Sequence, residues 1–284
     1  MKSFSRVEVV RCQPWLGTFV EIRARGRDDA DPSERMAAAV AEAFDRVRRV
    51  DELMSAFRPD SDVARLNREA RFREVRVHPW TFEVLRLSLE ISRRSAGAFD
   101  VTASSARLGQ RSGSFRSLRL LTGNRARFMA GVQVDLGGVA KGFAVDLAVE
   151  ALLGAGAESG SVNAGGDLRV FGDAVVPVAV RHPADPSRIV RVLPLRNAAI
   201  ATSAVYADPH AAPRLASRQG IRHRGEAALS RGRSISVVAP RCAVADALTK
   251  AIAILPESRA LSLLERYSAN ALDLSVALPC ESAA

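Results

Sequence analysis

The chain is 284 residues long, which allows one large domain or two small ones with a sizeable buried core. Hydrophobic residues make up 48% and charged residues 25%, and this composition excludes a disordered tail, a collagen and a disulfide scaffold. The net charge of +10 comes from arginines that are scattered without a lysine-rich tract or interleaved aromatic residues. We therefore expect no nucleic-acid partner, although a basic charge alone would attract one.

The sequence also bears on location and on cysteine chemistry. No stretch approaches the roughly 20 uninterrupted apolar residues of a membrane span, and residues 1–17 lack the apolar segment of a signal peptide. Cys12, Cys242 and Cys280 are odd in number and far apart, so they indicate neither a disulfide framework nor a metal cluster. We expect a cytoplasmic protein without stable membrane insertion.

The first hundred residues contain one predicted strand and two predicted helices. Apolar and charged residues alternate over 20–25, which is typical of a half-buried strand. Pro32 opens a helix whose apolar stripe continues to Met54, and a second helix follows Pro79.

The rest of the chain alternates glycine-rich turns with short elements. Because strands and helices are interspersed without regular βαβ spacing, the pattern favours an α+β fold with mixed sheets and flanking helices over a doubly wound sheet. The predicted helices cover 139–153, 244–255 and 261–267, and the predicted strands lie at 168–171, 175–180, 189–195, 234–239 and 272–278.

The strongest functional signal lies in residues 134–146 (VDLGGVAKGFAVD) and 161–169 (SVNAGGDLR). A strand runs into a Gly-Gly turn that opens a helix with Lys141 in its first turn. Backbone N–H groups and an ammonium then converge where a phosphate could sit. Only two further lysines exist, Lys2 and Lys250, in a chain that otherwise uses arginine, and a compact ammonium is not interchangeable with a guanidinium. The segment therefore predicts a phosphate site that needs a point charge.

These two segments resemble those of the ApbE family, the FAD:protein FMN transferases. The resemblance extends over residues 15–255, because further motifs of the family occur in the same order. They lie at Leu16-Gly17-Thr18, 54–67, 97–102, 199–203 and 245–248.

The resemblance implies a fold and a domain organisation. The expected architecture is α+β and T-fold-like, with two interlocked subdomains and the FAD site between them. Residues 15–255 would form the flavin transferase domain, and a helix and strand within 256–284 would complete it.

The resemblance also implies an activity, namely Mg²⁺-dependent transfer of FMN from FAD to a Ser or Thr hydroxyl of an acceptor redox protein, with release of AMP. Asp246, Lys250 and His223 are the candidate catalytic residues, with His223 as general base. The Ala140 carbonyl, Asp246 and Thr249 are the candidate metal ligands. The residues expected to bind FAD are Leu16, Phe57, Ala98, Phe99, Asp100, Gly137, Lys141, Phe143, Asn163 and Gly165.

One departure from the family leaves two alternatives open. The family carries a threonine as a metal ligand four residues after the aspartate, but here that position is Lys250 and the threonine is Thr249. An ammonium at i+4 lies on the same helix face as Asp246 and could replace the metal charge. Alternatively, Thr249 serves as the ligand and Lys250 points to the phosphates or to solvent.

Two functions therefore compete. The first is an active FMN transferase, and the second is an FAD-binding relative with weak or no transferase activity. A nucleic-acid-binding module is a third possibility that rests on charge alone.

Overall fold

The computed structural model describes residues 7–26, 32–103, 113–183, 185, 187–204 and 233–275. Its main sheet is antiparallel at every pair of neighbouring strands, which confirms the α+β class, since a doubly wound sheet would be parallel. In spatial order its strands are β1 (Val7–Trp15), β2 (Thr18–Gly26), β6 (Ser159–Ala164), β7 (Asp167–Phe171), β10 (Ala199–Ala204), β11 (Arg233–Ala239) and β12 (Asn270–Ser275).

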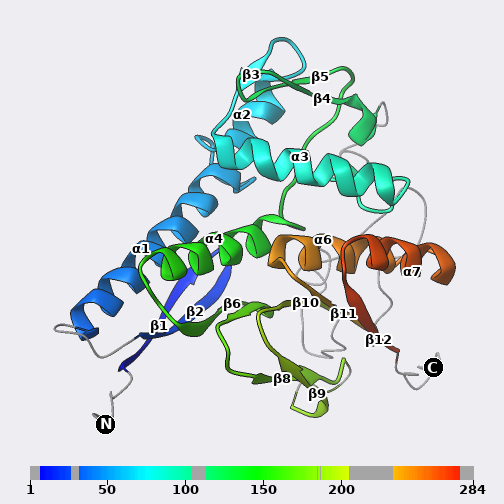
Figure 1. Ribbon diagram of the computed structural model, residues 1–284. Coiled ribbons are helices and arrows are strands. Elements are labelled where there is room, and N and C mark those ends of the chain that lie inside the picture. Colours follow the sequence, from blue (N-terminus) through cyan, green and yellow to red (C-terminus); the bar gives the residue numbers. More distant parts are fainter. Residues whose placement is uncertain are drawn as a thin grey trace, which may run out of the picture.

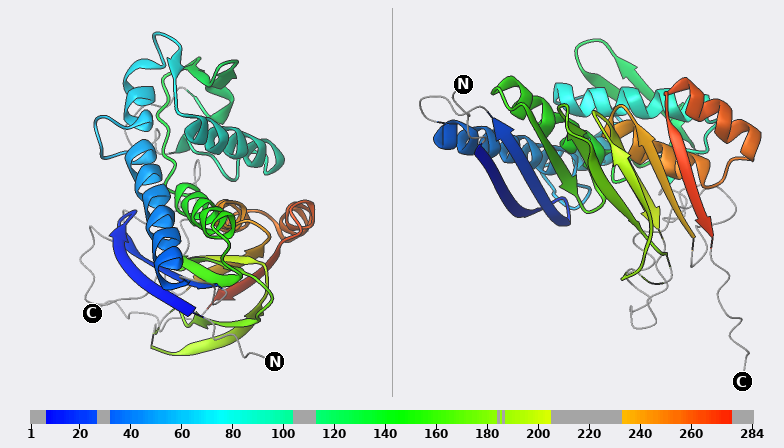
Figure 2. Two further views of the ribbon diagram at one scale, coloured as in Figure 1. Left: turned by 60° about the vertical axis from the view of Figure 1, so that its left-hand side comes forward. Right: turned by 60° about the horizontal axis from the view of Figure 1, so that its bottom comes forward.

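Helices cover one face of this sheet, as Figures 1 and 2 show. They are α1 (Pro32–Met54), α4 (Ala140–Gly154), α6 (Cys242–Ile252) and α7 (Glu257–Arg266). The hairpin of β8 (Val176–Arg181) and β9 (Ile189–Leu195) has a small apolar core of its own, in which Val180 and Leu195 pack with Val170 and Ile200 of the main sheet.

A second, smaller layer lies beyond these helices (Figure 1). It contains α2 (Asp62–Glu69), α3 (Pro79–Arg94), the short 3₁₀ helix η2 (Phe115–Ser117) and a small sheet of β3 (Val75–Arg76), β5 (Arg125–Phe128) and β4 (Leu118–Leu121). Helix α1 contacts both layers, since it packs on β1, β2 and α4 and also on α2 and α3. The two layers are thus interlocked.

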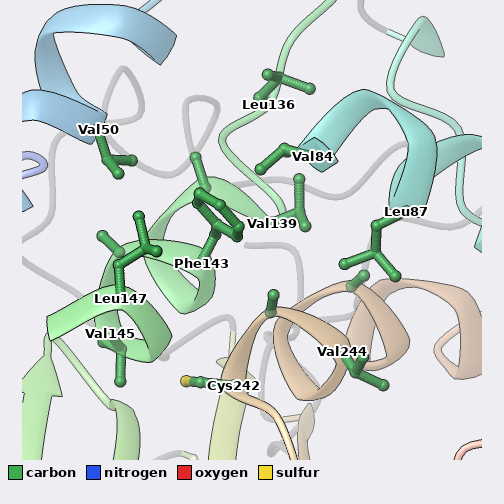
Figure 3. Packing of buried hydrophobic residues seen from close by; sticks show 14 of the residues in the cluster. Val50, Val84, Leu87, Leu136, Val139, Phe143, Val145, Leu147, Cys242 and Val244 are labelled. Atoms are coloured by element: carbon green, nitrogen blue, oxygen red, sulfur yellow. The ribbon is translucent and has the colours of Figure 1, made fainter. Parts of the chain in front are cut away.

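Helix α4 lies at the centre of the molecule. Most of its residues are apolar and buried because the sheet, α1 and α6 surround it, so it shows no amphipathic stripe. Gly142 brings α4 and α6 together, because a Cβ atom added there would lie 2.4 Å from the carbonyl oxygen of Cys242. Figure 3 shows Phe143 of α4 among buried side chains that include Val50, Val84 and Leu136.

The helices and strands predicted by residue range are present with shifted bounds, but the prediction of a strand that runs into the Gly137–Gly138 turn is wrong. Residues 132–136 belong to no strand, because the Val134 N–H and carbonyl bond the Asn67 side chain and not a neighbouring strand. The helix expected over 244–255 begins at Cys242 and ends at Ile252, and the helix expected over 261–267 is α7. The last predicted strand is β12 over Asn270–Ser275, and residues 276–278 lie outside the described residues. No helix within the described residues is long and apolar enough to cross a membrane.

Candidate active site

Two tight turns lie side by side at one end of the main sheet. Leu16 and Gly17 join β1 to β2 with positive φ angles of 57° and 70°, as expected for a two-residue hairpin turn. The neighbouring turn joins β6 to β7 through Gly165 and Gly166. A Cβ atom on Gly165 would lie 2.5 Å from the Thr18 hydroxyl oxygen, so the two turns are in direct contact.

Asn163 shapes the second turn. Its Oδ1 accepts a hydrogen bond from the Gly166 N–H at 3.0 Å. Gly166 has a φ of +99°, which favours glycine, and both glycines of the turn are exposed. The turn ends at Asp167, whose buried carboxylate faces the start of α4.

Four charged side chains form a cluster next to this turn, which we call the lysine–aspartate cluster: Lys141, Asp167, Asp246 and Lys250. Lys141 is ion-paired with Asp167, and its Nζ lies 3.8 Å from Asp246 Oδ2. Lys250 is ion-paired with Asp246 Oδ1 from the next turn of α6. The cluster therefore joins β7, α4 and α6 through alternating charges.

Burial and charge shift the pKa values within the cluster. Burial and the charge of Asp246 raise the pKa of Asp167 to about 6, against the opposing effects of Lys141 and Lys250. Burial would also raise the pKa of Asp246, but the two ammonium groups outweigh it and lower that pKa. For Lys141, burial opposes the charged form, and the carboxylates of Asp246 and Asp167 nevertheless raise its pKa. The shifts of Asp246 and Lys141 thus both favour the charged form.

The Gly137–Gly138 turn lies directly against this cluster. The Gly137 N–H donates to Asp135 Oδ1 at 2.9 Å, which sets the turn before α4. A Cβ atom on Gly138 would lie 3.5 Å from Lys250 Cε and 3.6 Å from Phe99 Cε2. Three segments that are distant in sequence thus meet here, and Phe99 comes from the smaller layer.

Asp100 and Phe143, both expected to bind FAD, stabilise the structure around the site. The Asp100 carboxylate accepts hydrogen bonds from the Thr102 N–H at 2.8 Å and hydroxyl at 2.7 Å, and from the Phe115 N–H at 3.1 Å. It therefore fixes its own loop. The Phe143 side chain is 1% exposed and packs in the core. Ala98, beside Phe99, is half-buried.

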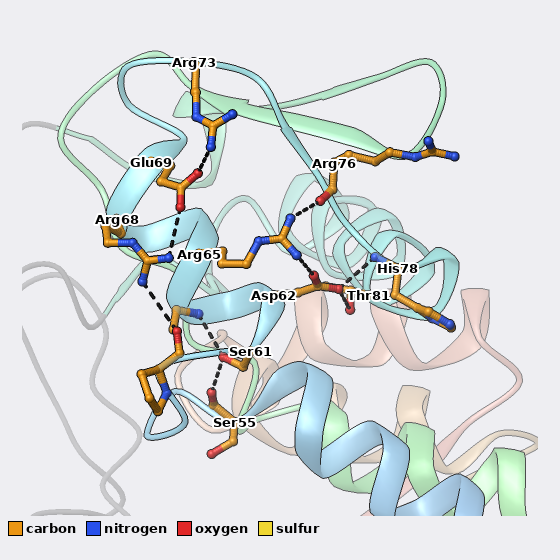
Figure 4. A network of polar contacts seen from close by, with 12 residues as sticks. Ser55, Ser61, Asp62, Arg65, Arg68, Glu69, Arg73, Arg76, His78 and Thr81 are labelled. Carbon is orange, nitrogen blue, oxygen red and sulfur yellow. Dashed lines mark hydrogen bonds and ion pairs between the residues drawn. The ribbon is translucent and has the colours of Figure 1, made fainter.

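Phe57 and Leu16 present apolar groups at the surface. Phe57 is 88% exposed and follows α1, whereas Leu16 is half-buried. Ser61 stabilises the loop after α1, because its hydroxyl donates to the Ser55 carbonyl at 2.7 Å and accepts from the Ala64 N–H at 2.9 Å (Figure 4). The exposed ring thus stands on a loop that hydrogen bonds hold in place.

The comparisons with known proteins agree with this geometry. A family model described as the ApbE family matches residues 16–273. The chain belongs to the ApbE family. It is 26% identical to the FAD:protein FMN transferase of Treponema pallidum (strain Nichols), over 94% of this chain and 83% of that protein. It is 24% identical to the FAD:protein FMN transferase of Vibrio cholerae serotype O1, over 89% of this chain and 83% of that protein.

Solved ApbE structures share the fold. The flavin transferase ApbE from Vibrio cholerae superposes with a TM-score of 0.76 at 21% identity, covering 95% of this chain and 94% of that one. The ApbE protein of Thermotoga maritima gives a TM-score of 0.74 at 20% identity, with 94% of both chains covered. The mixed architecture is therefore that of the ApbE family.

Asp146, the last residue of the first ApbE motif, has a role that the sequence did not reveal. Its carboxylate is buried and accepts hydrogen bonds from the Cys242 and Ala243 N–H groups at 2.9 and 3.0 Å. Arg169 donates to the same carboxylate at 2.8 Å. Asp146 thus supplies the N-terminal cap of α6, which positions Asp246. An acidic residue with only apolar neighbours over positions 143–149 was the available signal.

The expected metal ligands do not fit a divalent cation in this arrangement. Lys250 occupies Asp246 Oδ1, and Asp246 Oδ2 faces the Gly142 N–H at 3.4 Å and Lys141. The Thr249 hydroxyl donates to the Asp246 backbone carbonyl at 2.7 Å and lies 2.8 Å from Ser203 Oγ. Ala140 is buried at the start of α4. Within the described residues, no three His, Cys, Asp or Glu side chains gather as metal ligands.

His223, the expected general base, lies outside the described residues.

Proposed function

We propose that this chain transfers FMN from FAD to a Ser or Thr hydroxyl of an acceptor redox protein and releases AMP. The observation that carries the proposal is the convergence of the Gly137–Gly138 turn, the N-terminus of α4 and Lys141 in a chain of the ApbE family. Two relatives named FAD:protein FMN transferase support the same activity. A diphosphate bound at this turn would meet the Lys141 ammonium, while the N–H groups of Gly137, Val139 and Ala140 already donate within the turn.

The proposed reaction is a phosphoryl transfer. The acceptor hydroxyl oxygen attacks the phosphorus on the FMN side of the FAD diphosphate and forms a new P–O ester bond. The bond from that phosphorus to the bridging oxygen breaks, and AMP leaves with the electron pair. The hydroxyl proton passes to a base, for which His223 remains the candidate. Lys141 and the helix N-terminus would balance the charge that develops on the phosphate oxygens.

Two features of the surrounding surface support binding of a whole dinucleotide. Phe57 offers an exposed aromatic ring that could stack on a flat ring system. The exposed Gly165–Gly166 turn has no side chains, which allows a ligand to approach its backbone. Both features belong to segments that resemble those of the family.

The family resemblance also implies Mg²⁺, which in phosphoryl transfer neutralises charge and acts as a Lewis acid. Its expected ligands Ala140, Asp246 and Thr249 do not fit a divalent cation, because Lys250 and Lys141 already pair with Asp246.

The Asp246–Lys250 pair also favours a second candidate function. One ammonium supplies less charge than a divalent cation and no Lewis acid, so the chain could bind FAD and transfer FMN slowly or not at all. This alternative shares the binding site but not the chemistry.

One experiment tests both candidates. The purified chain is incubated with FAD and a candidate acceptor redox protein, and the acceptor is then examined by mass spectrometry. We expect a mass increase of one FMN less one water on a Ser or Thr residue, together with an equal amount of AMP. FAD binding without modification of any acceptor would favour the second candidate, and absence of FAD binding would contradict both.

A further inference from the structure

Lys250 occupies the position at which a cation would meet Asp246. We propose that its ammonium replaces a divalent cation there, so that this chain binds the diphosphate of FAD through Lys141 and Lys250 without Mg²⁺. The inference rests on the proposed function, because it concerns the same site and the same ligand. It differs from the expectation for the family, in which a hydroxyl stands at the position of Lys250.

Both carboxylate oxygens of Asp246 already have partners. Its carboxylate is 0% exposed, and Lys250 is paired with Oδ1. The other oxygen faces the Gly142 N–H at 3.4 Å and Lys141 Nζ at 3.8 Å. A cation could reach Asp246 only by displacing an ammonium from a buried partner. That displacement would bring like charges together in a site with little water to screen them.

The Thr249 hydroxyl is not directed to the carboxylate of Asp246. Thr249 is fully buried, and its hydroxyl donates to the backbone carbonyl of Asp246 at 2.7 Å. The same oxygen lies 2.8 Å from Ser203 Oγ on β10. Thr249 therefore ties α6 to the sheet, and its hydroxyl is bonded to Ser203 and to the Asp246 backbone, which disfavours the alternative in which it holds the metal.

Lys250 lies beside the turn that would bind the diphosphate. The methylene groups of its side chain pass next to Gly138, with Cε at 3.5 Å from a Cβ built on that glycine. Its side chain is 16% exposed, whereas Asp246 is fully buried. An ammonium has three N–H donors, and those not used by Asp246 can bind phosphate oxygens.

The expected consequence is a metal-independent affinity. An ammonium already in place needs no added ion to neutralise the diphosphate, so EDTA should change FAD binding little. Lys250→Thr should free Asp246 and restore an oxygen at i+4, which suits a hard divalent cation. The variant should then bind FAD more weakly in EDTA than the wild type and respond to Mg²⁺.

The test is a fluorescence titration of FAD into the wild type, Lys250→Thr and Thr249→Val, each in EDTA and in excess Mg²⁺. We expect less than a twofold effect of Mg²⁺ on the wild type and at least a tenfold effect on Lys250→Thr. Arg259→Met, which removes one exposed positive charge from α7, is the matched control and should behave as the wild type.

The outcomes are distinguishable. Binding of FAD to the wild type that strengthens tenfold or more with Mg²⁺ overturns this inference and leaves the proposed function standing. If Thr249→Val then abolishes the response, Thr249 is the metal ligand. No binding of FAD to the wild type under either condition overturns the proposed function and this inference together. Because the wild-type comparison needs no variant, a Lys250→Thr protein that fails to fold does not weaken the test.

Discussion

Lys141 contacts both the main sheet and α6 at the candidate site, through Asp167 and Asp246 respectively. Its ammonium is half-buried while both carboxylates are almost completely buried, so the positive charge is the part of the cluster that a ligand can reach. A raised pKa keeps it protonated over the whole range in which the protein would work.

We predict that Lys141→Ala weakens FAD binding by about 1.5 to 3 kcal/mol, the range for a hydrogen bond to a charged group, or roughly 10- to 150-fold. The wild type should bind FAD more tightly than FMN, because the proposed site would bind a diphosphate. Fluorescence titrations with both flavins check the two statements. Equal affinities of the wild type for FMN and FAD would contradict the site.

At the residue scale, the sequence predicted contacts that depend on local motifs and missed those that do not. The Gly137–Gly138 turn and Lys141 lie within one short segment. The sequence of that segment alone could therefore predict the turn, the start of the helix and the charge. Asp146 binds N–H groups 96 and 97 residues further along the chain, and no local pattern reports that partner. The placement of the site residues against FAD remains a prediction, because no bound ligand tests it.

Helices α4 and α6 carry the two lysines of the cluster, and Gly142 sets how closely they pack. We predict that Gly142→Ala destabilises the protein by about 1 to 3 kcal/mol, the cost of overpacking a tight core, because its Cβ would lie 2.4 Å from the Cys242 carbonyl oxygen. Chemical denaturation measures the change in the free energy of unfolding.

Gly154→Ala is the matched control for this prediction. It lies in the last turn of α4, where an added Cβ meets nothing within 4 Å, so it should be neutral or stabilising by up to about 1 kcal/mol. Equal effects of the two substitutions would show that the contact between α4 and α6 is not tight.

His78 caps the N-terminus of α3 and gives that helix a pH dependence. Its Nδ1 accepts from the Trp80 N–H at 3.2 Å, and burial together with the charge of Arg49 lowers its pKa, against the charge of Asp62. Since the folded pKa lies below the unfolded one, the stabilisation is fully present above the unfolded value of about 6.5 and is lost as the pH falls through the folded value.

We therefore predict that part of the stability, about 1 kcal/mol as for a typical N-cap, is lost between pH 7 and pH 5. His78→Asn keeps an acceptor at the cap and removes the titrating ring, so the variant should lose less stability over the same range. Urea unfolding of both proteins at the two pH values measures the difference. An unchanged pH dependence in the variant would exclude His78 as its source.

At the element scale, the sequence predicted helices and strands with strong periodicity. It missed strands that form only because neighbouring strands pair with them. Strand β6 has the sequence SGSVNA and β10 has AIATSA, and such small residues have little strand preference. Both are strands because β2 and β7 flank the first and β7 and β11 flank the second. Helix α6 begins two residues earlier than predicted because Asp146, from α4, caps it.

The whole molecule depends on its C-terminal segment. Strand β12 pairs with β11 along the edge of the main sheet, and α7 buries Leu263 and Leu264 in the core. We predict that a chain ending at residue 255 loses cooperative unfolding. Deleting α7 exposes the apolar surface that the two leucines cover, which removes about 3 to 6 kcal/mol from a total stability of roughly 5 to 15 kcal/mol, and the lost β-pairing adds to this.

A chain that ends at residue 275 keeps α7 and β12 and is the control, which should unfold like the full chain. Thermal unfolding followed by circular dichroism compares the three. A cooperative transition in the shorter chain would show that residues 15–255 form a complete domain without the C-terminal helix and strand.

The scarcity of lysine has a consequence for chemical labelling. Reagents that acylate amines react with the neutral form, and the chain offers them only its terminal amine and three lysines, two of which are in the lysine–aspartate cluster. Because carboxylates raise the pKa of Lys141, this lysine should resist acylation in the folded protein. Its rate of modification would therefore report how often its ion pairs with Asp167 and Asp246 open, without any introduced probe.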